Sequence, residues 1–271
     1  MYSRDEICSE ILKFYRHIIR HPYLDDDALT IPPAEGWSTI NNTAGKGATV
    51  VDLLRHLPYL RPSSPWSGKL LIYPGTIPIC YRDDETSYKE QMYPLPAHCV
   101  YLARRADYLG SDLILDTSNG AVTEFSLDNA LIPEDEYERL PEAEKWRAHP
   151  TVPLAELLGK WTLMYEELDW MVVPNPIGQP ETGRFYRRPD DTDFNGVDYE
   201  GGSELDRAQR DTRKRQQRHA ANVYDAYIRH GWPDCFDKER CRAELLVLEK
   251  AKDAEDRRIM DENNPDAASF E

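Results

Sequence analysis

Apolar residues repeat at helical spacing near the N-terminus and again in the middle of the chain. Behind a capping box formed by Ser3 and Glu6, apolar side chains recur every three or four residues as far as Ile18. A second, short helix is predicted over residues 49–57, and a stronger one over 153–171, where one face is apolar throughout. These three segments therefore predict amphipathic helices that each bury one face.

Between the second and third of these helices, short apolar runs are bounded by Pro, Gly and Asp, which is typical of strands. The clearest pair flanks Asn119-Gly120, a dipeptide that favours a two-residue type I′ hairpin turn. Such a turn would place Asp116 opposite Thr123, and it would direct Asp116 and Glu124 to opposite faces of the sheet. We therefore expect an α+β fold with a central, mainly antiparallel sheet flanked by amphipathic helices.

The last third of the chain has a different pattern. Residues 173–203 contain four prolines, five glycines and many carboxylates without periodicity, which predicts a long exposed loop. Residues 204–271 read as a long, mostly polar helical region. We expect a main α+β domain over 1–172, an exposed loop over 173–203, and a helical C-terminal region over 204–271 that packs on the main domain.

Composition limits the class of protein. The 271 residues are 40% hydrophobic, which is enough for a core, and 33 Lys and Arg against 49 Asp and Glu give a net charge of −16. Charged residues interrupt the first helix, and every apolar run is too short to span a bilayer, so neither export nor membrane insertion is expected. The five cysteines show no CxxC spacing, which favours reduced thiols and a cytoplasmic location.

Tests for nucleotide and metal motifs are negative. Gly45-Lys46-Gly47 precedes a predicted helix, but its surroundings do not fit the P-loop spacing, and the chain has no GxGxxG. His17 and His21 lie four residues apart, yet no third ligand follows at a recognisable spacing. An exposed histidine pair near a helix C-terminus, stabilised by the helix dipole, explains the same residues. We therefore expect no cofactor and no metal.

Six cations interrupt the acidic balance within the predicted C-terminal helical region. They are Arg207, Arg210, Arg213, Lys214, Arg215 and Arg218. Because residues three or four apart share one face of a helix, most of them would form a row that focuses positive potential on a polyanion such as tRNA. The alternative is a solvated helix whose cations pair with Glu204, Asp206 and Asp211.

Two groups of residues could carry chemistry. His98, Cys99 and Asp116 fall at the ends of predicted strands, where they could serve as base, nucleophile and acid. A buried, inert cysteine and an aspartate that stabilises the hairpin turn are the alternatives.

The second group is an acidic and aromatic segment made of Tyr165, Glu166, Glu167 and Asp169. It would suit a guanidinium substrate, because carboxylates bind that group in a bidentate manner and an aromatic ring stacks on it. Glu124 is a further candidate for substrate binding. The alternative is a helix with its acids in water and its aromatic rings in the core.

Several blocks of sequence together resemble the arginine-containing cyclodipeptide synthases of filamentous fungi, and the resemblance runs over most of the chain. They are HLPYLRP at 56–62, LPAHCVYLARRAD at 95–107, LILDTSNGAVTEFS at 113–126, VPNPIGQPETGRFYRR at 173–188 and GWPDCFDKERCRAELL at 231–246. The resemblance implies an enzyme that takes arginine from arginyl-tRNA and a second amino acid from another charged tRNA, and closes them into a diketopiperazine. It assigns no site residue.

The hairpin block also resembles the Smi1/Knr4 type of α+β domain, over the central sheet alone. That resemblance implies protein binding rather than catalysis. In that case the row of cations would be a counter-charge to the chain's own acids.

Overall fold

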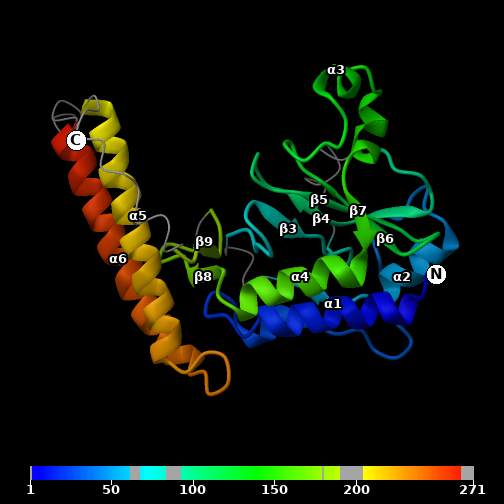
Figure 1. The fold of residues 1–271 in the computed structure, drawn as a ribbon. Coiled ribbons are helices and arrows are strands. Elements are labelled where there is room, and N and C mark those ends of the chain that lie inside the picture. The colour runs from blue at the N-terminus through cyan, green and yellow to red at the C-terminus, as the bar shows by residue number, and fades with distance from the viewer. Residues whose placement is uncertain (1, 62–67, 84–92, 179, 190–203, 264–271) are drawn as a thin grey trace, which may run out of the picture. The chain divides into compact units, whose positions relative to one another are not determined.

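The computed structural model describes residues 2–61, 68–83, 93–178, 180–189 and 204–263 (Figure 1). The chain divides into two compact units. The first comprises Met1–Arg20, Leu24–Leu163 and Pro180–Thr182, and the second comprises His21–Tyr23, Met164–Gln179 and Gly183–Glu271.

The first unit is built around a five-stranded sheet in which every neighbouring pair is antiparallel. Its strands are β3 (Thr76–Pro78), β4 (Cys99–Arg105), β5 (Asp112–Asp116), β6 (Ala121–Phe125) and β7 (Thr151–Pro153), and they follow one another across the sheet in chain order. The predicted α+β class with a mainly antiparallel sheet is therefore confirmed.

Amphipathic helices cover this sheet, as the spacing of apolar residues predicts. The helices are α1 (Arg4–Ile18), α2 (Ala48–His56) and α4 (Leu154–Glu166). Figure 1 shows α1 and α4 side by side along the sheet. The ring centroids of Phe14 in α1 and Trp161 in α4 lie 5.9 Å apart, so the two helices pack against each other. Ser3 caps α1 by accepting a hydrogen bond from the backbone N–H of Glu6 at 3.3 Å.

Short elements complete the first unit. They are η1 (Asp26–Ala28), a two-stranded sheet of β1 (Leu29–Thr30) and β2 (Tyr59–Leu60), the short helix α3 (Glu134–Tyr137) and η3 (Glu142–Ala148).

The β5–β6 hairpin has a longer turn than predicted. Asp116 lies opposite Ala121 rather than Thr123, so four residues make the turn. Gly120 alone takes the left-handed conformation there, with φ of +80°, and its N–H donates to the Asp116 carbonyl at 2.8 Å. The side chain of Asn119 accepts from the N–H of Ala121 at 2.8 Å, a contact that stabilises the longer turn. Because the register shifts by two residues, Asp116 and Glu124 still lie on opposite faces.

The second unit contains a hairpin of β8 (Trp170–Pro174) and β9 (Gly183–Arg187) and two long helices, α5 (Glu204–Arg229) and α6 (Lys238–Asn263). The two helices run side by side in Figure 1. Their core includes Met171, Val223, Tyr227 and Leu245, none of which is exposed. The Tyr227 hydroxyl donates to the Val172 carbonyl at 2.7 Å, which fastens α5 to β8.

The predicted domain limits differ from these units. The main segment of the second unit begins at Met164, inside α4, and not at residue 173. The stretch 173–203, which was predicted as one exposed loop, contains β9. The rest of that stretch, 190–203, lies outside the described residues. Gly183 begins β9 where a Cβ would come within 2.8 Å of Val172 Cγ1, so its glycine reflects close packing rather than a loop.

We expect Leu115→Ala to lower the free energy of unfolding of the first unit by about 3 kcal/mol, because this fully buried strand residue would leave a cavity. Leu127→Ala is the matched control, since that side chain is 62% exposed, and we expect a change below about 0.5 kcal/mol. Urea denaturation measures both. Equal changes in the two variants would contradict the assigned core.

Candidate functional site

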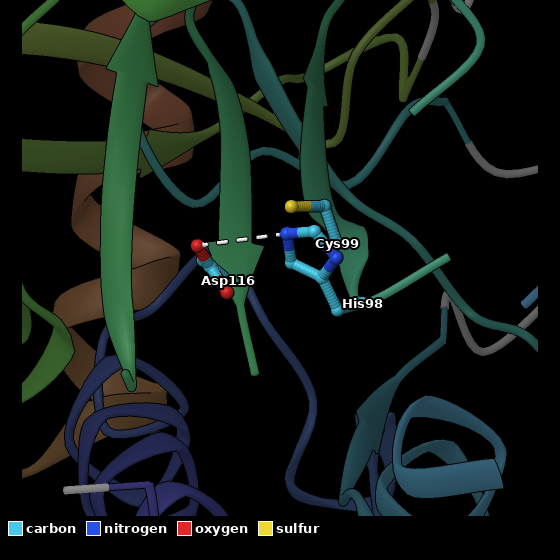
Figure 2. A group of neighbouring side chains, drawn as sticks. All are labelled: His98, Cys99 and Asp116. Atoms are coloured by element: carbon cyan, nitrogen blue, oxygen red, sulfur yellow. Dashed lines mark ion pairs between the residues drawn. The ribbon is translucent and has the colours of Figure 1, made fainter. Parts of the chain in front are cut away.

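Three of the predicted site residues meet at one end of the central sheet (Figure 2). Cys99 begins β4 and pairs with Asp116, the last residue of β5, while His98 precedes β4 in a turn. Because His98 lies outside the strand, its side chain is not forced to the opposite face from that of Cys99. The imidazole Nε2 lies 3.9 Å from Oδ2 of Asp116, and one ligand atom of each residue lies within 4.8 Å of the others. We call this group the strand-end cluster.

Hydrogen bonds fix the backbone of the strand-end cluster. The backbone N–H and the hydroxyl of Thr117 both donate to the His98 carbonyl, at 2.9 and 2.8 Å. The N–H and hydroxyl of Ser118 donate to Oδ1 of Asp116 at 2.7 and 2.6 Å, which leaves Oδ2 directed towards His98. Asp116 therefore both stabilises the hairpin turn and faces the imidazole.

The ammonium group of Lys46 donates to the Cys99 carbonyl at 2.9 Å. Lys46 of the Gly-Lys-Gly segment, which does not match a P-loop, therefore contacts the backbone of the strand-end cluster.

The Cys99 thiol is poorly suited to be a nucleophile. Its side chain has no solvent exposure, and burial, followed by the nearby Asp116 carboxylate, raises the pKa of the thiol to about 11. The positive charges of Arg147 and Lys46 act in the opposite direction without reversing the shift. Because the thiolate is the reactive form, the cluster favours chemistry through His98 and Asp116.

Glu124 does not join this cluster. It lies on the opposite face of the sheet, where the Ser111 hydroxyl donates to its carboxylate at 3.2 Å and burial raises its pKa.

The acidic and aromatic segment belongs to the second unit, and there the chain itself supplies a guanidinium. Arg188 forms an ion pair with Asp169 at 2.7 Å and donates to the Glu167 carbonyl at 3.0 Å. The Glu166 carbonyl accepts a hydrogen bond from the Trp232 indole at 2.8 Å. Tyr165 is fully buried and contacts the ring of His21 rather than solvent. Asp169, which was predicted to bind the guanidinium of a substrate, thus already binds that of Arg188.

The basic row lies on the outer face of α5. Arg210, Lys214 and Arg218 lie four residues apart, on the side opposite Val223 and the rest of the core. Lys214 and Arg218 are exposed and Arg210 is half-buried. Within the described part of the chain, Arg210 and Arg218 form no ion pair. Of the three acids in the solvated-helix alternative, Asp211 has a described side chain, and it forms no ion pair with the row.

The other two described cations of the predicted set lie on the flanks of α5. Arg215 donates to the Thr212 hydroxyl at 3.0 Å, and Arg213 faces a groove described below. Of the sixth, Arg207, the structure gives the helical backbone only, and the side chains of Glu204 and Asp206 also lie outside the described residues.

A groove of about 430 Å³ that was not predicted lies between β9, α5 and α6. Among the described residues, its lining includes five cations and no carboxylate side chain. The cations are Arg184, Arg187, Arg188, Arg213 and Lys252, and Phe185, Tyr186 and two glutamines complete the polar and aromatic lining. Three of these cations are paired with acids outside the lining: Lys252 with Asp256 at 2.7 Å, Arg184 with Glu249 and Asp253, and Arg188 with Asp169. Arg187 is exposed and forms no ion pair among the described residues. We call this feature the basic groove.

A buried carboxylate organises the basic groove. Glu249 of α6 has no solvent exposure, and it accepts hydrogen bonds from Arg184 at 2.8 Å and from the Tyr186 hydroxyl at 3.0 Å. Its second oxygen lies 2.6 Å from Nε2 of His219. Arg184 also pairs with Asp253 at 2.6 Å, and these carboxylates, Asp253 first, raise the pKa of the guanidinium.

His17 and His21, which were expected to be exposed, are both buried. Nδ1 of His21 lies 3.2 Å from the Tyr227 hydroxyl, and its ring packs on Trp232 at 4.5 Å, so it belongs to the core of the second unit. All five cysteines are free. In the described parts of the chain, no helix combines the length and the apolar character needed to cross a membrane.

Comparison of the chain with models of known protein families, with curated proteins and with solved structures gave no match.

We expect one thiol, that of the exposed Cys235, to react rapidly with a disulfide reagent at pH 8. With a pKa of about 11, only about one Cys99 thiol in a thousand would be ionised, and burial restricts access further. Reagent consumption is followed in the native protein and after unfolding, with Cys235→Ser as the control. A rapid thiol that remains in Cys235→Ser and disappears in Cys99→Ala would contradict the assignment.

Proposed function

We propose that this protein is a tRNA-dependent cyclodipeptide synthase that binds its charged tRNA substrates, arginyl-tRNA among them, through the second unit. The observation that carries the proposal is the basic row on the outer face of α5, which accompanies the basic groove in a chain of net charge −16. A protein repelled as a whole by a polyanion needs a local surface of opposite sign to bind it.

The size of this surface favours a polymer over a small anion. Arg210 and Arg218 are two helical turns apart, a separation of about 12 Å along the helix, so the row reaches beyond a single phosphate. The groove adds the exposed guanidinium of Arg187, which suits phosphate oxygens, and the half-buried aromatic rings of Phe185 and Tyr186, which suit unpaired bases. A single-stranded tRNA end offers both.

The chemistry needs no nucleoside triphosphate, because the ester bond of an aminoacyl-tRNA is already activated. The amine of one aminoacyl group attacks the ester carbon of the other, an amide forms, and one tRNA leaves through its ribose hydroxyl. The free amine of the resulting dipeptide then attacks its own ester, which closes the diketopiperazine and releases the second tRNA. Each attack transfers one proton from the amine, directly or through a base, to the leaving hydroxyl.

Within the first unit, the strand-end cluster supplies a base for this proton transfer. The His98 side chain is 51% exposed, so a substrate can reach it, and Oδ2 of Asp116 lies 3.9 Å from its Nε2. The buried, protonated Cys99 supports direct attack by the amine rather than an acyl-enzyme on that residue. A reaction that uses charged tRNA would take place in the cytoplasm, where these molecules serve translation.

A protein-binding module of the Smi1/Knr4 type is the second candidate. The burial of Cys99 favours it, because a strand-end cysteine that is inert needs no catalytic explanation. It requires the basic row to be neutralised by the chain's own acids, and the lack of an ion pair at Arg210 and Arg218 among the described residues speaks against that.

We expect reversal of Arg210, Lys214 and Arg218 to Glu to weaken tRNA binding at least tenfold near physiological salt. The slope of log affinity against log salt should become shallower by about 2 to 3. Each phosphate contact that is lost reduces the number of counterions released when tRNA binds. Reversal of Lys13, Arg16 and Arg139, exposed cations of the first unit, changes the net charge equally and is the control. If both variants bind tRNA equally weakly, the effect comes from the net charge of the protein, and the basic row is not the tRNA-binding surface.

We expect purified protein and charged tRNA pools to give an arginine-containing cyclic dipeptide whose formation is abolished by ribonuclease. His98→Ala should slow product formation about 100-fold or more while tRNA binding stays unchanged, as for loss of a general base. Mass spectrometry identifies the product. If the protein binds tRNA but gives no product from any pool, the cyclodipeptide synthase activity is contradicted and tRNA binding is not. If the protein neither binds tRNA nor gives product, a protein-binding module of the Smi1/Knr4 type is favoured.

A further inference from the structure

The strand-end cluster has the donor set of a transition-metal site. A thiol sulfur, an imidazole nitrogen and a carboxylate oxygen are the three donor types found in protein zinc sites. We propose that His98, Cys99 and Asp116 bind a divalent zinc-type ion with one coordination position left open. The proposal rests on the first unit alone and does not depend on tRNA binding or on cyclodipeptide synthesis.

The distances fit such an ion after a small adjustment. Ligand atoms around a tetrahedral zinc lie about 3.3 to 3.7 Å apart, as follows from bond lengths of about 2.0 to 2.3 Å. In the structure, Nε2 of His98 and Oδ2 of Asp116 are 3.9 Å apart, and the three ligand atoms all lie within 4.8 Å of one another. Contraction by about 1 Å is within reach of side-chain rotation, because the imidazole of His98 is half exposed.

The surroundings hold two of the ligands in position. Cys99 and Asp116 face each other across a pair of neighbouring strands, so the sheet itself sets their separation. The carboxylate is oriented by Ser118, which occupies Oδ1 and leaves Oδ2 for the ion. Hydrogen bonds of this kind to the second oxygen are characteristic of carboxylate ligands in metal sites.

Once the thiol is ionised, the two negative charges of the cluster would offset the cations beside it, so binding would depend on the donor atoms rather than on an excess of local charge. Thiolate and carboxylate together carry two negative charges, and two cations, Arg147 and Lys46, act on the thiol. Of these, Lys46 is already bound to the Cys99 carbonyl. A bound divalent ion would displace the thiol proton, as metals do at coordinating cysteines, and would thereby turn an inert buried cysteine into a ligand.

The open position determines what the ion could do. Sites with three protein ligands keep a fourth place for water or a carbonyl oxygen, whereas structural sites use four protein ligands. The ion would occupy Nε2 of His98, so the imidazole would serve as a base only in the metal-free protein, and the metal-bound cluster would act through this fourth position.

The test uses cobalt(II) as the probe, in the full-length protein freed of metal by a chelator. We expect one cobalt ion per chain, with a sulfur-to-cobalt charge-transfer band in the near ultraviolet and tetrahedral bands in the visible. Cys99→Ser should lose the charge-transfer band, and His98→Ala and Asp116→Ala should weaken binding at least tenfold. Cys80→Ser removes a buried thiol and Cys235→Ser an exposed one, and both should keep the full spectrum.

Zinc provides a readout that does not depend on the spectrum. Zinc should raise the thermal midpoint of the wild type and of Cys235→Ser but not that of His98→Ala. Because His98 is exposed, this variant should fold normally, so a failure of Cys99→Ser to fold would not leave the question open. No binding by the wild type, or a cobalt spectrum and zinc shift that are unchanged in His98→Ala, would overturn the metal site whatever the outcome of the tRNA experiments.

Discussion

The structure of the second unit depends on the hydrogen bonds and ion pair of the buried Glu249 carboxylate. A carboxylate without solvent exposure costs several kcal/mol unless charged or polar partners surround it. Its partners come from other elements, Arg184 and Tyr186 from β9 and His219 from α5, at 2.6 to 3.0 Å. The hairpin and both long helices must therefore be docked together before this group is satisfied.

That requirement explains how an acidic chain forms a basic surface. Arg184 is bound by Glu249 and Asp253 on one side and lines the basic groove on the other, and Arg188 is fixed in the same way by Asp169. The acids lie outside the groove lining and order guanidinium groups that would otherwise be flexible. Arg187 and the basic row on α5 add further positive charge. Among the described residues, Arg187, Arg210 and Arg218 form no ion pair. Cations are thus gathered on one part of a chain whose net charge is −16.

Local patterns predicted the elements better than their environment. The apolar period is enough to find α1 and α4, because each depends on residues close in sequence. The hairpin register was wrong by two residues, since the side chain of Asn119 stabilises a longer turn that the dipeptide rule ignores. The strand β9 was missed because its glycine and arginines resemble a loop until packing against Val172 is known.

The candidate sites show the same division. The strand-end cluster could be predicted because strand ends place residues together, and the row on α5 because a helix has a fixed period. The basic groove could not, because three elements far apart in sequence form it and Glu249 looks like any other acid in a charged helix. Asp169 was predicted to bind an external guanidinium, and no local pattern indicates that Arg188 occupies it.

Comparison of Glu249→Ala with Glu255→Ala tests most directly whether this buried carboxylate builds an RNA-binding surface. Both remove one negative charge from α6, and simple electrostatics predicts tighter tRNA binding in each. We expect Glu249→Ala instead to lose about 3 kcal/mol of unfolding free energy and to bind tRNA at least tenfold more weakly, because its partners are left unsatisfied. The exposed Glu255 should tolerate the change, with equal or tighter binding. Unchanged or tighter binding by Glu249→Ala would contradict the role assigned to the groove.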